Sequence, residues 1–511
     1  MRKLFAVFAA LLILCACGGG KTAEVTEYDL NGGISSLDPQ FAEGSAEQTA
    51  IANLFLGLIC RSESDNALYP ACAESWEVQN NGTRYIFHLC DGLTWSDGTA
   101  ITSDDFLFAF ERMFSPESPS PYAQAYSEIE NAAEVLSGEA EMSVLGVSAP
   151  DESTLVITLS HADCTFLTLL AQTPAMPCSR EFFAGQKGRY GLDADSILTN
   201  GAFSLASWTS SALGLVRNGN APVTAQIENL QLNLNIDRAD AEARFSDGVT
   251  EACLFDNRSD AAGTYGGWYL VWDRTWSLVL NPAAETLGDS NVRAAVLGAI
   301  GNETLEKAVV ENSTEPKGLI PDGFTVDKLT YRNVGQAEVP DFPDDPRGTL
   351  QSAFERLGVE QYPSLTLLLC EEEPGIGYGG AMQRDWSSTL SLYVNVETLP
   401  YDTLVSRVAG GDFDLALVPL WTKSGDKTGG LQTVANLLGE DDYGINATLS
   451  EALRQQSAES TVKLLYSAEQ TILDEYLALP VCDTQRVFLQ KSAQSHIWYS
   501  PTDGVTYCFT A

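Results

Sequence analysis

The sequence contains few basic residues and very few histidines. Its 511 residues include 29 lysines and arginines against 69 aspartates and glutamates, which gives a net charge of −40. A surface this acidic repels nucleic acid and anionic lipid, so neither is expected as a binding partner. The three histidines, His88, His161 and His496, form no H-x-x-x-H or H-E-x-x-H pattern, so a histidine-based zinc site is not expected.

Several nucleotide-binding and catalytic motifs are also missing. The sequence has no Walker loop and no G-x-S-x-G elbow, so neither ATP hydrolysis nor α/β-hydrolase chemistry is expected. The run Gly375–Gly380 does fit G-x-G-x-x-G, but Glu371–Glu373 precede it, and negative charge there disfavours a pyrophosphate. We interpret this run as a flexible surface loop. The sequence therefore predicts no enzyme activity, no cofactor and no metal.

The only long hydrophobic run lies at the N-terminus. Arg2 and Lys3 precede the apolar run Leu4–Leu14, which is the pattern of a secretory signal and is too short for a stable bilayer span. Leu14-Cys15-Ala16-Cys17 fits a bacterial lipobox. We therefore expect a signal peptide over residues 1–16, lipid on Cys17 and a tether through residue 23; an ordinary secretory signal is the alternative.

The cysteines leave an open question. Without Cys15 and Cys17, nine of the eleven cysteines remain, so at least one stays unpaired or pairs between chains. Cys60 with Cys72, and Cys164 with Cys178, are near enough in sequence to form disulfides after export. The sequence alone cannot decide either pairing. No C-x-x-C pair occurs, and the spacings suit no zinc site.

The most informative stretch runs from Leu68 to Phe114. Asn80-Asn81-Gly82 predicts a tight hairpin turn, and Tyr85–Leu89 alternates like a half-buried strand. Thr102 followed by Asp105 predicts a helix start, because a threonine caps the first turn and an acid favours the positive end of the helix dipole.

This stretch resembles the extracellular solute-binding proteins of family 5, which serve ABC importers of oligopeptides and dipeptides. The family signature combines P-x-L-A-x-S-W, a strand ending in F-x-L-R, W-S-D-G and T-A-x-D-F. The matching residues are Pro70, Ala73, Ser75, Trp76, Phe87, Leu89, Trp95, Ser96, Asp97, Gly98, Thr102, Asp105 and Phe106, with Cys90 in place of the arginine. The segments 35–47 and 118–123 resemble the oligopeptide-binding branch in particular.

The resemblance implies an α/β fold of the two-lobed periplasmic-binding-protein type, with an extra inserted α+β lobe. Lobe I would comprise residues 24–60, 191–264 and 485–511, the inserted lobe residues 61–190, and lobe II residues 265–484. Residues 461–511 would supply a helix and strands that cross back to lobe I. Trp268, Trp272 and Trp276 read as strand residues of the core, with pocket lining as the alternative.

The resemblance also implies how a ligand is held. Members of the family close around an extended peptide, which hydrogen-bonds to main chain like an added strand. Glu43, Gly44 and Ser45 would supply such contacts, and Tyr122 would line the site from the inserted lobe. In lobe II, Phe413-Asp414 and Trp421 match the family pattern, and Asp426 is the acid nearest to the aspartate that pairs with the ligand's α-amino group.

The implied function is capture of peptides by a receptor that is anchored to the extracytoplasmic face of the cell membrane, or free in the periplasm. Its partners would be the peptide, the permease and ATPase subunits of an ABC importer, and the membrane through the lipid, and the protein would be a monomer. One alternative is the same fold with another solute, a nickel chelate or an oligosaccharide. An extracellular hydrolase or a structural lipoprotein is the alternative from another class.

Overall fold

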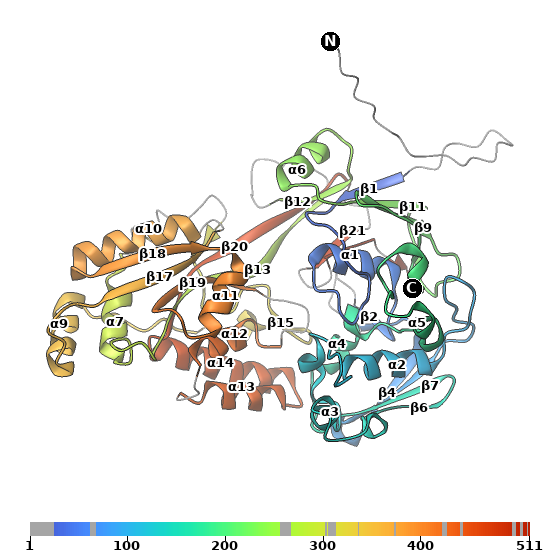
Figure 1. The fold of residues 1–511 in the computed structure, drawn as a ribbon, viewed down its shortest axis with the longest axis horizontal. Helices are drawn as coiled ribbons and strands as arrows, with labels where there is room; N and C mark the ends of the chain where they lie inside the picture. The colour runs from blue at the N-terminus through green and yellow to red at the C-terminus, as the bar shows by residue number, and fades with distance from the viewer. Residues whose placement is uncertain are drawn as a thin grey trace, which may run out of the picture.

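The protein is described by a computed structural model with two lobes (Figure 1). The structure describes residues 25–61, 68–255, 267–301, 304, 313–335, 337–371, 375–421, 427–439, 443–492, 497–500, 504–507 and 509–510. We keep the names lobe I, inserted lobe and lobe II for the ranges given above, whose limits remain predictions. None of the helices in this described part combines the length and the apolar character that a bilayer crossing needs.

Lobe I is built on a four-stranded sheet that brings the start of the chain beside residues near 230. The strand order is β1 (Val25–Asp29), β11 (Asn229–Asn233), β9 (Ala212–Arg217) and β8 (Phe203–Trp208), with β1 parallel to β11. Helix α1 (Ser45–Leu54) packs against β8, and α6 (Arg238–Ser246) packs against β12 (Ala252–Phe255).

The inserted lobe holds the signature stretch. Its sheet has the order β4 (Ala73–Gln79), β5 (Arg84–Leu89), β7 (Thr154–Thr158) and β6 (Val147–Asp151), and α2 (Ser103–Met113) packs on β6 and β7. The predicted hairpin is confirmed: β4 and β5 pair antiparallel, and Asn81 takes φ 56°, a left-handed conformation that asparagine tolerates. The helix start is also confirmed, because Thr102 and Asp105 form a reciprocal capping box.

Lobe II contains a seven-stranded sheet covered by helices. The strand order is β12, β20 (Ala478–Gln490), β13 (Gly267–Leu280), β19 (Leu415–Trp421), β17 (Ser364–Cys370) and β18 (Tyr393–Leu399), and β14 (Ser313–Thr314) pairs with β20. The helices are α7 (Ser290–Gly298), α9 (Pro346–Leu357), α10 (Gly375–Asp385), α11 (Tyr401–Ala409), α12 (Leu431–Leu438), α13 (Ile445–Leu453) and α14 (Ala458–Asp474).

Shorter elements complete the described chain. These are the helices α3 (Ala132–Leu136), α4 (Phe166–Leu170) and α5 (Arg180–Gln186), and the strands β2 (Ile59–Arg61), β3 (Leu68–Pro70), β10 (Thr224–Ala225), β15 (Thr325–Val326), β16 (Leu329–Thr330), β21 (Ile497–Ser500), β22 (Gly504–Tyr507) and β23 (Phe509–Thr510).

Two long antiparallel strands, β13 and β20, join the lobes (Figure 1). At one end, β20 pairs with β12 and Phe488 belongs to the hydrophobic core of lobe I and the inserted lobe. At the other end, Trp276 and Cys482 belong to the separate core of lobe II. The register of the pair shifts between Trp272 and Arg274, so the strands bend where the chain passes from one core to the other. We call this place the crossing.

One interpretation of the sequence needs correction, and another is confirmed in part. The run Gly375–Gly380 is not a loop but the start of α10, which connects the parallel strands β17 and β18. Its glycines allow the helix to lie close to the sheet: a Cβ at Gly375 would lie 2.8 Å from the Trp276 ring, and one at Gly379 would lie 2.3 Å from Leu369. The core role of Trp276 is confirmed, whereas the side chains of Trp268 and Trp272 lie outside the described part.

The two suggested disulfides are not formed. Cys60, Cys72, Cys164 and Cys178 are free thiols. Cys164 Sγ lies 3.4 Å from the hydroxyl of Thr461 in lobe II, and Cys178 Sγ lies 3.4 Å from the Arg112 guanidinium. Cys164 and Cys178 therefore contact different parts of the protein, although only fourteen positions separate them in the sequence.

Asp483 is a buried carboxyl on β20, with only 2% of its surface exposed. The hydroxyl of Thr275 donates to its Oδ1 at 2.5 Å. Burial raises the pKa of Asp483 to about 7; Asp322 also raises it, whereas the Thr275 hydrogen bond and the charges of Arg332 and Lys317 lower it. The carboxyl therefore titrates near neutral pH in the folded state.

We expect Asp483→Asn to raise the thermal midpoint at pH 8 more than at pH 5. A carboxyl whose pKa is raised on folding destabilises the folded state as it ionises, so stability is lost between about pH 4 and pH 7. The full loss is at most about 4 kcal/mol, because one pKa unit corresponds to about 1.4 kcal/mol. Asparagine keeps an acceptor for Thr275 and carries no charge. Melting curves of both proteins at the two pH values test this, and an equal difference at both would contradict it.

Candidate functional site

The predicted main-chain contacts lie in an exposed turn that leads into α1. Glu43, Gly44 and Ser45 are exposed, and Gly44 is the N-cap of the helix with φ −69° and ψ 145°. A Cβ on Gly44 would lie 1.8 Å from a carboxylate oxygen of Glu47, so a side chain there would displace Glu47. That carboxylate is held in place because Ser35 donates to it from its backbone N–H at 3.0 Å and from its hydroxyl at 2.7 Å.

Tyr122 of the inserted lobe contacts this same turn. Its hydroxyl donates to the carbonyl oxygen of Ala42 at 2.7 Å and accepts from Gln48 Nε2 at 2.9 Å. Ala42 directly precedes Glu43, and Gln48 is on α1. The structure therefore brings together four of the residues that the resemblance selected, Glu43, Gly44, Ser45 and Tyr122, from two parts of the chain.

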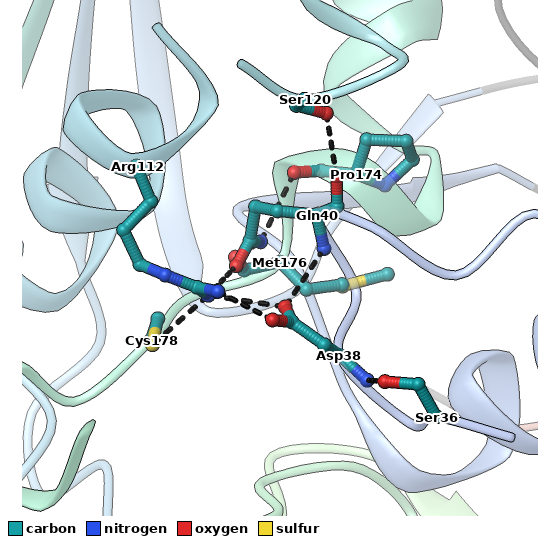
Figure 2. Close-up of polar contacts among 8 residues, drawn as sticks. All are labelled: Ser36, Asp38, Gln40, Arg112, Ser120, Pro174, Met176 and Cys178. Atoms are coloured by element: carbon teal, nitrogen blue, oxygen red, sulfur yellow. Dashed lines mark hydrogen bonds and ion pairs between the residues drawn. The ribbon is translucent and has the colours of Figure 1, made fainter. Parts of the chain in front are cut away.

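A buried ionic network fixes the segment just before the turn. Figure 2 shows the Arg112 guanidinium directed between Asp38, Gln40 and Cys178. Arg112 Nη1 lies 3.1 Å from Asp38 Oδ1 and 2.6 Å from Gln40 Oε1, and the side chains of Arg112 and Asp38 are 7% and 11% exposed. A second ion-pair contact joins Arg112 Nη2 to Asp38 Oδ2. Because Arg112 is on α2, this network ties the inserted lobe to lobe I.

The same network holds Gln40 from both sides. Gln40 Nε2 donates to the carbonyl oxygens of Met176 at 2.9 Å and Pro174 at 3.2 Å, and the Ser120 hydroxyl donates to the Gln40 carbonyl (Figure 2). The guanidinium of Arg112 also lies 4.3 Å from the ring centre of Phe183, a favourable cation–π distance. The segment Asp38–Gln40, which leads into the turn at residues 43–45, is thus fixed by buried contacts. Gly44, in the turn itself, has no side chain.

Trp421, the predicted site residue of lobe II, ends β19 at the crossing. It is half-buried, and its register partner on β13 is Arg274. The Arg274 guanidinium lies 4.5 Å from the Trp421 ring centre. Strands β17, β18 and β19 are parallel, so Trp421 lies at their carboxyl ends, where ligands bind in open α/β sheets.

Of the two candidate acids of lobe II, Asp414 and Asp426, the structure describes only Asp414. Asp414 lies at the opposite end of β19 from Trp421, where its Oδ2 accepts the Thr366 N–H at 2.7 Å beside a hollow of about 300 Å³. It is therefore not placed to share a site with Trp421. Asp426 and Cys17 lie outside the described residues, so both remain predictions.

In the described part of the chain, a buried ion pair joins lobe II to the inserted lobe. Lys427 Nζ lies 2.7 Å from Asp163 Oδ2, and the two side chains are 8% and 1% exposed. The other oxygen of Asp163 accepts from the backbone N–H and the hydroxyl of Thr165 at 2.8 and 2.7 Å. Lys427 directly follows Asp426 in the sequence.

The two described histidines each face a glutamate and are partly exposed. His88 faces Glu77 at 3.8 Å and is 41% exposed, and His161 faces Glu128 at 3.3 Å and is 54% exposed. His496 lies outside the described residues. The described site offers exposed main chain at Glu43–Ser45, the aromatic ring of Trp421 and fixed charged side chains. This combination suits the binding of a ligand.

Sequence reasoning missed the residues that hold the site together. Asp38–Arg112 and Asp163–Lys427 are separated by 74 and 264 positions, and no local pattern links partners so far apart. Asp163 did carry a weak local signal, because an aspartate two residues before a threonine forms an Asx turn.

Comparison with known proteins identifies the family of this chain. The model of the bacterial extracellular solute-binding proteins, family 5, matches residues 67–438. A probable deoxycholate-binding periplasmic protein, YgiS of Escherichia coli, is 34% identical over 221 residues, which are 42% of this chain and 41% of that protein. The periplasmic oligopeptide-binding protein OppA of Escherichia coli is 35% identical over 177 residues, 34% of this chain and 32% of that protein. These alignments span less than half of either relative.

The fold is also that of solved structures over nearly its whole length. The substrate-binding domain of an oligopeptide ABC transporter from Bacillus anthracis superposes with a TM-score of 0.75, covering 95% of this chain and 98% of that chain at 20% identity. At this identity the superposition shows the fold alone.

Proposed function

The chain belongs to the bacterial extracellular solute-binding proteins of family 5, and from this premise we propose that it captures peptides between its lobes for an ABC importer. The observation that carries the proposal is the exposed turn Glu43–Ser45, held by Tyr122. Such a turn offers its main chain to an extended peptide, and backbone hydrogen bonds tolerate any side chain. Trp421 contributes aromatic surface from lobe II, and Asp426 remains the proposed partner of the peptide's α-amino group.

The test is a binding experiment with a turnover control. Mixed tetrapeptides are added to the purified protein, and bound and free peptides are measured by mass spectrometry over a day. We expect retention of one peptide per protein, without hydrolysis products. Steady conversion of the peptides would favour the hydrolase alternative, and the absence of any retained peptide would overturn the proposal.

A second candidate ligand has one observation in its favour. The relative YgiS is named for deoxycholate, a carboxylate with a large apolar body, and in this chain Arg274 and Trp421 place a cation beside an aromatic ring. Competition between deoxycholate and the tetrapeptide mixture in the same assay distinguishes the two. Peptide capture predicts that deoxycholate displaces no peptide at equal concentration.

The proposal includes attachment to the outer face of the cell membrane through lipid on Cys17, and function as a monomer with the importer's permease and ATPase. We expect Cys17→Ser to release the protein from washed membranes, because serine cannot carry the thioether-linked lipid that the proposal assigns to Cys17. Cys60→Ser is the matched control and should leave the protein in the membrane fraction. Immunoblots of both fractions measure this, and persistence of Cys17→Ser in membranes would contradict lipid anchoring.

A further inference from the structure

Cys72 and Cys90 lie opposite each other at the open end of the hairpin formed by β4 and β5. Ala73 pairs with Leu89 in the antiparallel register, so Cys72, one residue before Ala73, faces Cys90, one residue after Leu89. The backbone N–H of Cys90 donates to the carbonyl oxygen of Cys72 at 2.9 Å. The two cysteines are therefore a cross-strand pair.

The spacing of such a pair suits a disulfide. Opposite residues that share a backbone hydrogen bond have Cα atoms about 5.5 Å apart, and disulfides join Cα atoms about 4.4–6.8 Å apart. Their side chains leave the sheet on the same face with Cβ atoms about 4.5–5.5 Å apart, whereas a disulfide needs about 3.5–4.5 Å. The small approach that remains is little resisted, because Cys72 precedes β4 and Cys90 follows β5, outside the regular strands.

In the structure both cysteines are free thiols that contact carbonyl oxygens. Cys90 Sγ lies 3.5 Å from the carbonyl oxygen of Ala71, the residue before Cys72. Cys72 Sγ lies 3.4 Å from the carbonyl oxygen of Leu56, and the residue is 1% exposed. Rotation of the two side chains about their Cα–Cβ bonds therefore brings the sulfur atoms together on one face of the hairpin.

Cys60 is the third cysteine of this region, but it does not lie opposite Cys72. It pairs with Tyr69 between β2 and β3, and its Sγ lies 3.8 Å from the Tyr69 carbonyl oxygen. Cys72 instead donates its backbone N–H to the carbonyl oxygen of Gly57 at 3.0 Å. The strand pairing thus selects Cys90 as the partner of Cys72, although Cys60 is nearer in sequence.

The pair lies where the inserted lobe meets lobe I. Asn200 of lobe I donates from Nδ2 to Cys72 Sγ at 3.5 Å and to the carbonyl oxygen of Leu56 at 2.8 Å. The backbone N–H of Leu56 donates in turn to Asn200 Oδ1 at 3.0 Å. A bond from Cys72 to Cys90 would therefore fix the hairpin of the inserted lobe at its junction with lobe I.

We propose that Cys72 and Cys90 form a disulfide outside the cytoplasm. The family to which the chain belongs is extracellular, and disulfides form and persist in such oxidising surroundings. The proposal concerns stability and does not depend on which ligand the protein binds. Its failure would leave peptide capture untouched.

The oxidant is a low-molecular-weight disulfide, R–S–S–R. The thiolate of half-buried Cys90 attacks one sulfur, which forms the mixed disulfide and releases R–SH; the thiolate of Cys72 then attacks the Cys90 sulfur and releases the second R–SH. The two protein thiols lose two electrons and two protons, and R–S–S–R gains them. Burial raises the pKa of both thiols, and Glu74 and Asp91 raise that of Cys90 further, so the first step is slow.

The experiment maps the link in the purified full-length protein. The folded protein is kept overnight with excess oxidised glutathione, remaining thiols are blocked with N-ethylmaleimide, and trypsin digestion without reduction is followed by mass spectrometry. Trypsin cuts after Arg61 and Arg84, so Cys60, Cys72 and Cys90 fall in three separate peptides and each pairing gives a distinct linked product. We expect the peptides of Cys72 and Cys90 to be linked in most of the protein.

The thermal midpoint gives a second readout. The disulfide closes the β4–β5 hairpin, and closing a loop of this size should raise the midpoint of the oxidised protein above that of the reduced protein by about 5 °C. Cys90→Ser should abolish both the linked peptide and this difference. Cys60→Ser is the matched control and should keep both.

Each outcome supports or overturns the pairing. A link from Cys60 to either of the other two cysteines overturns it, and so does recovery of all three peptides unlinked after oxidation. If Cys90→Ser folds and still shows the redox-dependent midpoint, the stabilising bond lies elsewhere and the proposal is wrong. If Cys90→Ser does not fold, the linked peptides of the wild-type protein and of Cys60→Ser decide.

Discussion

Replacing Lys427 by methionine should separate the lobes and lower the thermal midpoint. The change strands the Asp163 carboxylate, which is 1% exposed, without its counter-charge, and breaking a buried pair by removing one partner costs about 3–5 kcal/mol. Because the two residues belong to lobe II and the inserted lobe, that loss falls on the contact between lobes. Small-angle scattering of the ligand-free protein should show a larger radius of gyration, and calorimetry a lower midpoint.

Two variants control this prediction. Lys463→Met removes an exposed lysine paired with Glu459 within α14, and exposed pairs contribute about 0–1 kcal/mol. The double variant Asp163→Asn/Lys427→Met leaves no buried charge, and it should be more stable than Lys427→Met alone. If the radius of gyration and midpoint of Lys427→Met match those of Lys463→Met, the pair does not hold the lobes together.

Arg112→Ala should destabilise the protein by about 3–5 kcal/mol, because Asp38 would be left buried and unpaired. It should also weaken peptide binding, since the Asp38–Gln40 segment leads into the turn at Glu43–Ser45. Urea denaturation measures the first effect, and the retention assay on the folded fraction measures the second.

Arg180→Ala is the matched control, because it removes another arginine that forms ion pairs with α2. Arg180 reaches from α5 to Asp104 and Glu111 of α2, but its side chain is 43% exposed, so its loss should cost about 1 kcal/mol or less. Equal denaturation midpoints for the two variants would mean that the network of Figure 2 contributes no more than a surface pair.

Local features of the fold could be predicted from the sequence because their causes are local. The turn at Asn80–Gly82 and the capping box of Thr102 and Asp105 depend on residues within a few positions of each other. The two-lobed fold came from the signature stretch by resemblance, and it is confirmed by the solved structures. The strands around Trp276 followed from their aromatic and β-branched residues.

Other features could not be predicted from the sequence, because they depend on contacts between residues that are far apart along the chain. Gly375–Gly380 read as a loop because glycines are weak helix formers, yet they start α10, where their small size lets the helix approach Trp276 and Leu369. Arg274 reaches Trp421 and Thr484 only through the pairing of β13 with β19 and β20.

The most direct test of the account is native mass spectrometry of the protein purified without denaturation from cells grown in peptide-rich medium. We predict a population heavier than the chain by the mass of short peptides, in a ratio of one ligand to one protein, with fragment spectra that read as amino-acid sequence. A bound population made of non-peptide molecules, or a protein that stays ligand-free in that medium and in added tetrapeptides, would contradict peptide capture.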